Sequence, residues 1–480
     1  MKESFFLYKK EKFILIFVFI LVTATKLKFF YVGYWFDEWH TFFYSNPYFL
    51  KLENLNKLIN NSAAPPLFFL ITSLLHKLFG YSPEAGRFFS MFFDFLSLVI
   101  LYFLVNKNFF QKVNFFILLF FLLNYSLILY SIELRFYSFY VFVTLGNVYL
   151  FFNYFNNQSN INFAKYFFFS LFALSSNYFL IPIILIQFLY FFLKKKKFIY
   201  KVLLFLYLFV GLNFTHLTTV NELNSQNVWG DLDISFFLGY YFNIFFGSKL
   251  LGGLVLVLMA VIFAINFKKI KSNEKLVLLI FFILSTYLFF IVYSFILTPV
   301  LRPRYFLHLV PLILCVMVIM IFMINSINIR NSILAFFTLF HVILLIFFSL
   351  PFLKPDTNKL ADILESEKFP LAVEDFEYTY INKNNNLSEI DHGNYQNLYF
   401  INHLVNLERF KNLDLNFISK KKINEYKIFL EICQNNPDYH TKIPGDDLNC
   451  LKNNYYKFGY KIIKQLRTRD FIVNKYQKIS

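Results

Sequence analysis

The chain has 480 residues, 58% of them hydrophobic, and its mean hydropathy is +0.52. This composition excludes an ordinary soluble protein and predicts many membrane-spanning segments. The net charge of +17 could suggest a nucleic-acid ligand. Short basic clusters between the apolar segments explain it better, because cytoplasmic loops are enriched in lysine and arginine. We therefore expect no nucleic-acid partner.

A bilayer span needs about 20 apolar residues, and on that length the sequence predicts about eleven spans. The first runs from about Phe13 to Tyr31, after a lysine-rich start that should stay in the cytoplasm. The run lacks a small-residue cleavage site, so we interpret it as a retained anchor and not a signal peptide. The loop at residues 33–84 then lies outside, with a short interfacial helix ending at Phe79. A true span in this loop would invert the orientation of everything downstream.

The remaining spans are expected to alternate between a basic and a less basic side. Four consecutive lysines at 194–197 mark the cytoplasmic side, whereas the loop at 215–233 contains acids but no lysine or arginine. The spans are predicted at about 87–105, 115–131, up to 155, a pair across 163–193, 198–213, up to 268, 276–297, 304–325 and 333–350.

An odd number of spans places the C-terminal tail outside the cytoplasm. We therefore predict a mainly α-helical, polytopic membrane bundle at residues 1–351 and an extracytoplasmic α/β domain at 352–480. The tail has roughly 125 residues, enough for one core. Its apolar patches at 371–373 and 427–430 fit strands or helices, although a disordered tail is the alternative.

Three cysteines are present. Cys315 lies within a predicted span, where it is expected only to pack. Cys433 and Cys450 lie in the tail, where an oxidising environment allows a disulfide but spacing alone does not decide it.

Two adjacent carboxylates, Asp37 and Glu38, stand between aromatic residues directly after the first span. Carboxylates are costly near hydrocarbon, so acids at this place usually serve function. We interpret Asp37 as a general base and Glu38 as a metal or acceptor ligand. The alternative is a pair that merely ends a helix in water. His40 follows closely and could reach a metal, so a divalent cation held by Glu38 and His40 is the candidate cofactor.

Several arginines are expected at the outer ends of spans, where the positive-inside rule predicts few. An anionic partner explains them, because guanidinium binds phosphate bidentately and stays charged. Facing a carboxylate pair, such a cluster suits sugar transfer, in which the leaving phosphate needs cations and the acceptor must lose a proton. The alternatives are snorkelling for the arginines, a structural Glu133–Arg135 ion pair, and an interfacial aromatic belt for the tyrosines. The residues concerned are Arg87, Glu133, Arg135, Tyr137, Arg302, Arg304 and Tyr305.

Four motifs occur in one order along residues 13–311. They are Asp37–Glu38, Pro65-Pro66-Leu67 followed by Arg87, the segment Tyr130-Ser131-Ile132-Glu133-Leu134-Arg135-Phe136-Tyr137, and Arg304-Tyr305 followed by Pro311. In this order they resemble glycosyltransferase family 39, the protein O-mannosyltransferase-like family of the GT-C class, which is also similar to the lipid A aminoarabinose transferases. The third segment is similar to that family's Tyr-Ser-x-Glu-x-Arg-x-Tyr pattern.

The resemblance implies a GT-C fold and transfer of a sugar from a polyprenyl-phosphate donor at the outer face of the cytoplasmic membrane. It implies the role of base for Asp37 and contact with the donor phosphate for Arg135 and Arg304. The acceptor would be a glycolipid, a polysaccharide or a protein. One position departs from the family, because Ala64 stands where a histidine often precedes the Pro-Pro-Leu motif. A transporter or flippase, or a non-catalytic binder of lipid-linked sugars, is the alternative.

Overall fold

The computed structural model describes part of the chain, in two compact units. Arg302 and Cys450 lie outside the described residues, as do the side chains of Asp37, His40 and Cys433, so the predictions made for them stay predictions. One unit comprises residues 1–30 and 44–349, and the other comprises 31–43 and 350–480. The expected boundary at 351 differs from this division in that the segment at 31–43 groups with the tail. The described residues are 9–28, 30, 36–61, 64–109, 111–194, 198–226, 249–297, 300–301, 303–347, 357–373, 417–419, 423, 425–434, 455, 459–467 and 471–479.

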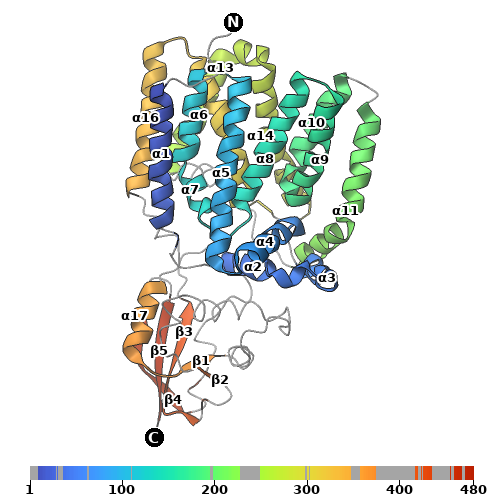
Figure 1. Ribbon diagram of the computed structural model, residues 1–480. Coiled ribbons are helices and arrows are strands. Elements are labelled where there is room, and N and C mark those ends of the chain that lie inside the picture. Colours follow the sequence, from blue (N-terminus) through green and yellow to red (C-terminus); the bar gives the residue numbers. More distant parts are fainter. Residues whose placement is uncertain are drawn as a thin grey trace. The chain divides into compact units, whose positions relative to one another are not determined.

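The first unit is a bundle of long helices that run side by side (Figure 1). Short 3-10 segments, η2 (Tyr178–Leu180) and η5 (Pro303–Leu309), precede α10 and α15. The helices are α1 (Lys9–Lys28), α5 (Pro83–Asn108), α6 (Gln111–Leu123), α7 (Tyr125–Ser131), α8 (Tyr137–Asn156), α9 (Asn160–Ser176), α10 (Ile181–Lys194), α11 (Ile199–Gln226), α13 (Lys249–Ser272), α14 (Glu274–Ile296), α15 (Val310–Phe322) and α16 (Ile327–Phe347).

The bundle has the surface of a multi-pass membrane protein. Within the described part of the chain, six helices are long and apolar enough to cross a bilayer, or seven if the pair α6 and α7, bent by 52°, is one span. Large apolar side chains point outward, such as Phe13, Leu212 and Ile265, which are 71%, 71% and 76% exposed. A water-soluble protein would bury such a surface, whereas lipid solvates it. Each predicted span overlaps a helix, but the count of eleven stays a prediction.

Helix α8 is the centre of the bundle and packs against α5, α9 and η5. Its interior face carries a polar network that joins three helices. Asn147 donates from Nδ2 to Ser170 Oγ at 2.9 Å, and Gln187 Nε2 donates to Asn147 Oδ1 at 2.8 Å. Tyr166 completes the network by donating from its hydroxyl to Gln187 Oε1 at 2.8 Å. Such side chains satisfy one another between helices where water is absent.

The outer loop folds into short elements, η1 (Pro47–Leu50), α3 (Leu52–Asn61) and α4 (Pro66–Phe79). Figure 1 shows α3 and α4 running across the ends of the long helices. Helix α4 begins with a proline at its first position and ends before Gly80, whose φ of 104° favours glycine. With 14 residues it is short for a span, in agreement with the predicted interfacial helix.

The second unit contains helix α2 (Phe36–Tyr44), apart from its last residue, and a small α/β domain. The domain has α17 (Thr357–Glu367) and a sheet in the order β2-β1-β3-β5-β4, with β1 parallel to both neighbours and the other pairs antiparallel. Buried aromatic residues form its core, among them Phe429, Tyr460 and Tyr476. The predicted α/β tail is thereby confirmed. The strands are β1 (Leu371–Val373), β2 (Phe417–Ser419), β3 (Ile428–Gln434), β4 (Tyr460–Arg467) and β5 (Phe471–Lys478).

Candidate active site

Arg135 lies in an irregular segment, residues 132–136, between α7 and α8. The segment is buried, and Arg135 itself is only 6% exposed. Its backbone N–H donates to the Glu133 carbonyl at 2.8 Å, and its own carbonyl accepts from Ser90 Oγ at 3.4 Å. The guanidinium carbon lies 4.6 Å from the ring centre of Phe136 and 5.6 Å from that of Tyr137. The irregular backbone presents the Arg135 side chain between two helices, inside the protein.

The close approach of α5 to this segment depends on Gly86. A Cβ atom at Gly86 would lie 2.4 Å from Cδ1 of Leu134, which is itself buried. Glycine therefore permits a contact that a larger residue would obstruct, and it lies next to Arg87 in the chain.

The second arginine segment, η5, packs directly on α8. Arg304 is half-buried, and its guanidinium carbon lies 5.8 Å from the ring centre of Tyr305. Tyr140, one turn along α8 from Tyr137, interacts electrostatically with Arg135, Tyr137 and Tyr305. The structure thus brings Arg135, Tyr137 and Tyr305 together from two parts of the chain.

Arg87 has a different environment from Arg135. It is fully buried, and its Nη1 donates to the Phe30 carbonyl at 2.5 Å, just beyond the end of α1. Roughly two helical turns along α5, Asp94 pairs with Lys26 of α1 at 2.6 Å. Both contacts hold the end of α1 against α5. The contact with Phe30 gives Arg87 a structural role, and the donor-phosphate role predicted for it stays a prediction.

Sequence analysis missed three members of the tyrosine and histidine group. Tyr140 shares helix α8 with Tyr137, and Tyr178 interacts electrostatically with Tyr140. Tyr178 in turn hydrogen-bonds to His216 Nδ1 at 2.8 Å, with His216 almost wholly buried. The i, i+3 spacing from Tyr137 could have indicated Tyr140, whereas no sequence signal indicated Tyr178 or His216.

His308, four residues after Arg304 in the chain, is fully buried. Its Nδ1 lies 3.0 Å from the carbonyl of Tyr305, and its ring packs on Phe179 and Phe306. It therefore supports the position of Tyr305 from within the bundle.

The acid pair lies in helix α2, in the other unit. Glu38 is fully buried there, which is unusual for a carboxylate and suits a functional group better than a solvated helix end. The expected opposition of the acids and the arginines stays a prediction. Among the described residues there is no group of three or more metal-ligating side chains. A metal at Glu38 and His40 is likewise untested.

The first unit resumes at Tyr44, and aromatic packing holds the chain there. Tyr44, the last residue of α2, is buried with its ring 6.0 Å from Phe49 and 5.7 Å from Phe69. Just after it, the Ser45 carbonyl lies 3.0 Å from Nδ1 of His76 in α4. Burial lowers the pKa of His76, with the Ser45 hydrogen bond opposing it, so a neutral imidazole donates this bond at pH 7. The chain that follows the acid pair therefore has a rigid anchor.

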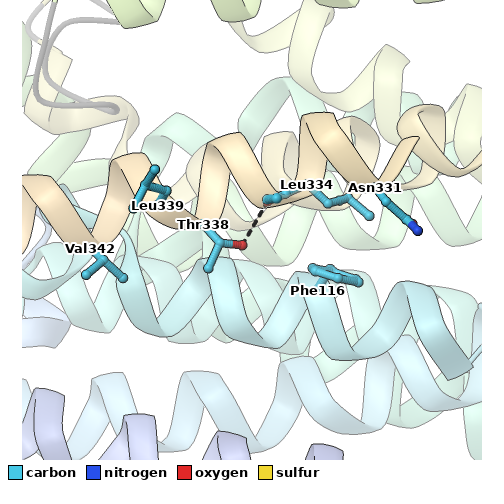
Figure 2. Close-up of a pocket in the computed structure, with 7 residues that line it drawn as sticks. Phe116, Asn331, Leu334, Thr338, Leu339 and Val342 are labelled. Carbon is cyan, nitrogen blue, oxygen red and sulfur yellow. Dashed lines mark hydrogen bonds between the residues drawn. The ribbon is translucent and has the colours of Figure 1, made fainter. Parts of the chain in front are cut away.

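A groove between α6 and α16 is lined almost wholly by apolar side chains (Figure 2). Its volume is about 450 Å³, and it contains none of the candidate site residues. Its one hydroxyl, on Thr338, donates to the Leu334 carbonyl at 2.8 Å. The groove therefore offers no chemistry beyond apolar contact. It is lined by Phe116, Asn331, Leu334, Ala335, Thr338, Leu339 and Val342.

Comparison with known proteins shows the fold. The chain resembles ArnT from Cupriavidus metallidurans bound to undecaprenyl phosphate, with a TM-score of 0.51 and 10% sequence identity over 95% of this chain and 97% of that one. It resembles the same protein in the apo state with a TM-score of 0.52 and the same identity and coverage. No family model and no curated protein matches the sequence. At this identity the likeness establishes a GT-C-type membrane fold over nearly the whole chain.

Proposed function

We propose that the protein is an integral membrane glycosyltransferase that transfers a sugar from a polyprenyl-phosphate donor to an acceptor at the outer face of the cytoplasmic membrane. The observation that carries the proposal is the buried Arg135, held among Tyr137, Tyr140 and Tyr305 inside a fold shared with an undecaprenyl-phosphate-bound protein. A guanidinium stays charged and binds phosphate bidentately, which supports a lipid phosphate as the ligand of this group.

In the proposed reaction a carboxylate accepts the proton of the acceptor, and two arginines stabilise the leaving phosphate. An acceptor hydroxyl attacks the anomeric carbon and gives its proton to the carboxylate of Asp37. The bond from the anomeric carbon to the phosphate oxygen breaks, and its electron pair leaves with the polyprenyl phosphate. Arg135 and Arg304 stabilise the charge on that leaving oxygen. Glu38 positions the acceptor or a divalent cation.

In this proposal Glu133, Arg302 and His40 are supporting residues, and Arg87 is a further contact of the donor phosphate. Arg87 also holds the end of α1 through the Phe30 carbonyl. Residues 1–351 form the membrane domain, and residues 352–480 form an outer domain that helps select the acceptor.

The experiment is a mass-spectrometric comparison of glycolipids, glycoproteins and polyprenyl phosphates in membranes with and without the protein. When the protein is absent, we expect one sugar of defined mass to be missing from the acceptor. We also expect the sugar-loaded polyprenyl-phosphate donor to accumulate. An Arg135→Gln variant should reproduce this loss, whereas Arg330→Gln, at the opposite end of the bundle, should not. Unchanged donor and acceptor pools in cells without the protein would exclude the proposal.

A further inference from the structure

A cluster of basic and amide side chains lies where α5 and α8 end and α14 begins. Lys107 Nζ donates to Asn153 Oδ1 at 2.5 Å, and Lys275 Nζ donates to Asn108 Oδ1 at 2.8 Å. Asn156 also donates to Asn108, at 3.2 Å. These residues come from three helices that are distant in sequence, and all three helix ends lie at the end of the bundle that carries the N-terminus (Figure 1). We refer to Lys107, Asn108, Asn153, Asn156 and Lys275 as the basic cluster.

The two ammonium groups of the basic cluster have neutral partners. Each donates to an amide oxygen, and Lys107 repels Lys275 electrostatically. The acid next to Lys275 in sequence, Glu274, pairs instead with Lys194 at 2.9 Å. Lys275 is half-buried, so its charge is only partly solvated. An anion bound between the two lysines would relieve both the repulsion and the desolvation.

The surroundings select the kind of anion. The three helices cross the membrane domain, and two of them carry outward-facing apolar residues farther along, such as Phe103 of α5 and Leu284 of α14, which are 52% and 58% exposed. A phosphate linked to hydrocarbon chains fits a basic site beside such a surface, and basic pockets between spans at the cytoplasmic side bind anionic head groups. From the amide-held lysine pair we infer that the basic cluster binds the phosphate of an anionic phospholipid in the leaflet opposite the candidate active site.

The test is lipid retention by the full-length protein, measured by native mass spectrometry after purification with phosphatidylglycerol or phosphatidylcholine. The test variant is Lys107→Gln with Lys275→Gln. The matched control is Lys268→Gln with Lys271→Gln. These lysines are exposed at the end of α13, and their replacement removes the same amount of charge. Circular dichroism and gel filtration confirm that both variants fold.

The test variant should lose phosphatidylglycerol affinity about tenfold or more, because it removes two charged donors that contact the bound phosphate directly. The control should change it less than about threefold, and phosphatidylcholine retention should be the same in all proteins. Equal losses in both variants would show general surface attraction and overturn the site. Displacement of the lipid by millimolar inorganic phosphate would show a site for a soluble anion, and would also overturn the inference.

Discussion

At the scale of single residues, two arginines lie against aromatic rings. Arg135 is buried beside Phe136 and Tyr137, and Arg304 lies beside Tyr305. The Tyr130–Tyr137 pattern proposes Arg135 as a site residue, and that role stays a prediction. The contacts of Arg87 with Phe30, and of Lys26 with Asp94, could not be predicted, because they depend on which helices pack together. Lys26 and Asp94 are charged residues within apolar segments, where each needs a partner. The sequence does not identify that partner.

Gly86 provides a prediction about the geometry around Arg135. Gly86→Ala should lower activity and thermal stability, because its Cβ would enter the space of the buried Leu134 side chain. The control is Gly253→Ala in α13, where nothing lies within 4 Å of the added Cβ. That change should be neutral or stabilise by about 0.5–1 kcal/mol, because alanine favours helix more than glycine. Thermal unfolding in detergent measures both variants, and equal effects would contradict the close contact.

Glu367, at the end of α17, provides a prediction about pH. It bonds Lys464 at 2.5 Å and Lys475 at 2.9 Å, and hydrogen bonds from these lysines lower its pKa below the ordinary 4.5. A lowered carboxyl pKa stabilises the folded state above the ordinary pKa, and this contribution is lost as pH falls through the lowered value. On acidification from pH 5, the protection factors of β4 and β5 amides, measured relative to the intrinsic exchange rate at each pH, should therefore fall.

Glu367→Gln should already show faster exchange at pH 7, by about 1 kcal/mol of opening free energy, with a smaller further change in acid. Glu365→Gln on the same helix is exposed and serves as the control, with wild-type exchange expected at every pH. A Glu367→Gln profile that follows the wild type would refute the ion-pair account.

At the scale of secondary-structure elements, helix α8 differs from the outer helices because protein surrounds most of it. Helix α8 contains Asn147 and several tyrosines, yet most of it is buried against α5, α9 and η5. A helix surrounded by protein needs less apolar surface than a helix surrounded by lipid, so hydropathy underestimates it. The bend between α6 and α7 likewise arises where Asn124 caps α7, with its Oδ1 accepting from the Leu127 N–H at 3.1 Å.

The polar network of α8, α9 and α10 yields a prediction at this scale. Asn147→Leu and Gln187→Leu should each destabilise the detergent-solubilised protein by about 1 kcal/mol, because each leaves a buried partner without its hydrogen bond. The double variant should lose less than the sum of the two single losses, since both changes remove the same bond. Strictly additive losses would show that the two residues act independently.

At the scale of the whole molecule, the sequence predicted a helical membrane bundle with a small α/β tail, and the fold confirms both. The boundary between the two units was harder to predict from the sequence, because the segment at 31–43 is remote in sequence from the tail with which it groups. For the same reason, sequence order alone could not define how Asp37 is positioned relative to Arg135.

The predicted orientation can be tested with cysteine labelling. In a variant whose native cysteines are serine, Ser366→Cys in α17 should react with a membrane-impermeant maleimide in intact cells or spheroplasts. Ser272→Cys, at the C-terminal end of α13, should react only after permeabilisation, because this lysine-rich end is expected in the cytoplasm. Both side chains are exposed, so access through the protein is not limiting. The opposite labelling pattern would show an inverted topology.

The central claim is that Asp37 accepts the proton during transfer from a polyprenyl-phosphate sugar, and one measurement addresses it directly. Purified wild-type and Asp37→Asn proteins are reconstituted with the donor identified by the membrane comparison, and release of polyprenyl phosphate and donor binding are both followed. We expect Asp37→Asn to bind donor as the wild type does while its turnover falls by about a hundredfold or more, the contribution of a general base. Wild-type turnover in a stably inserted Asp37→Asn protein would contradict the account.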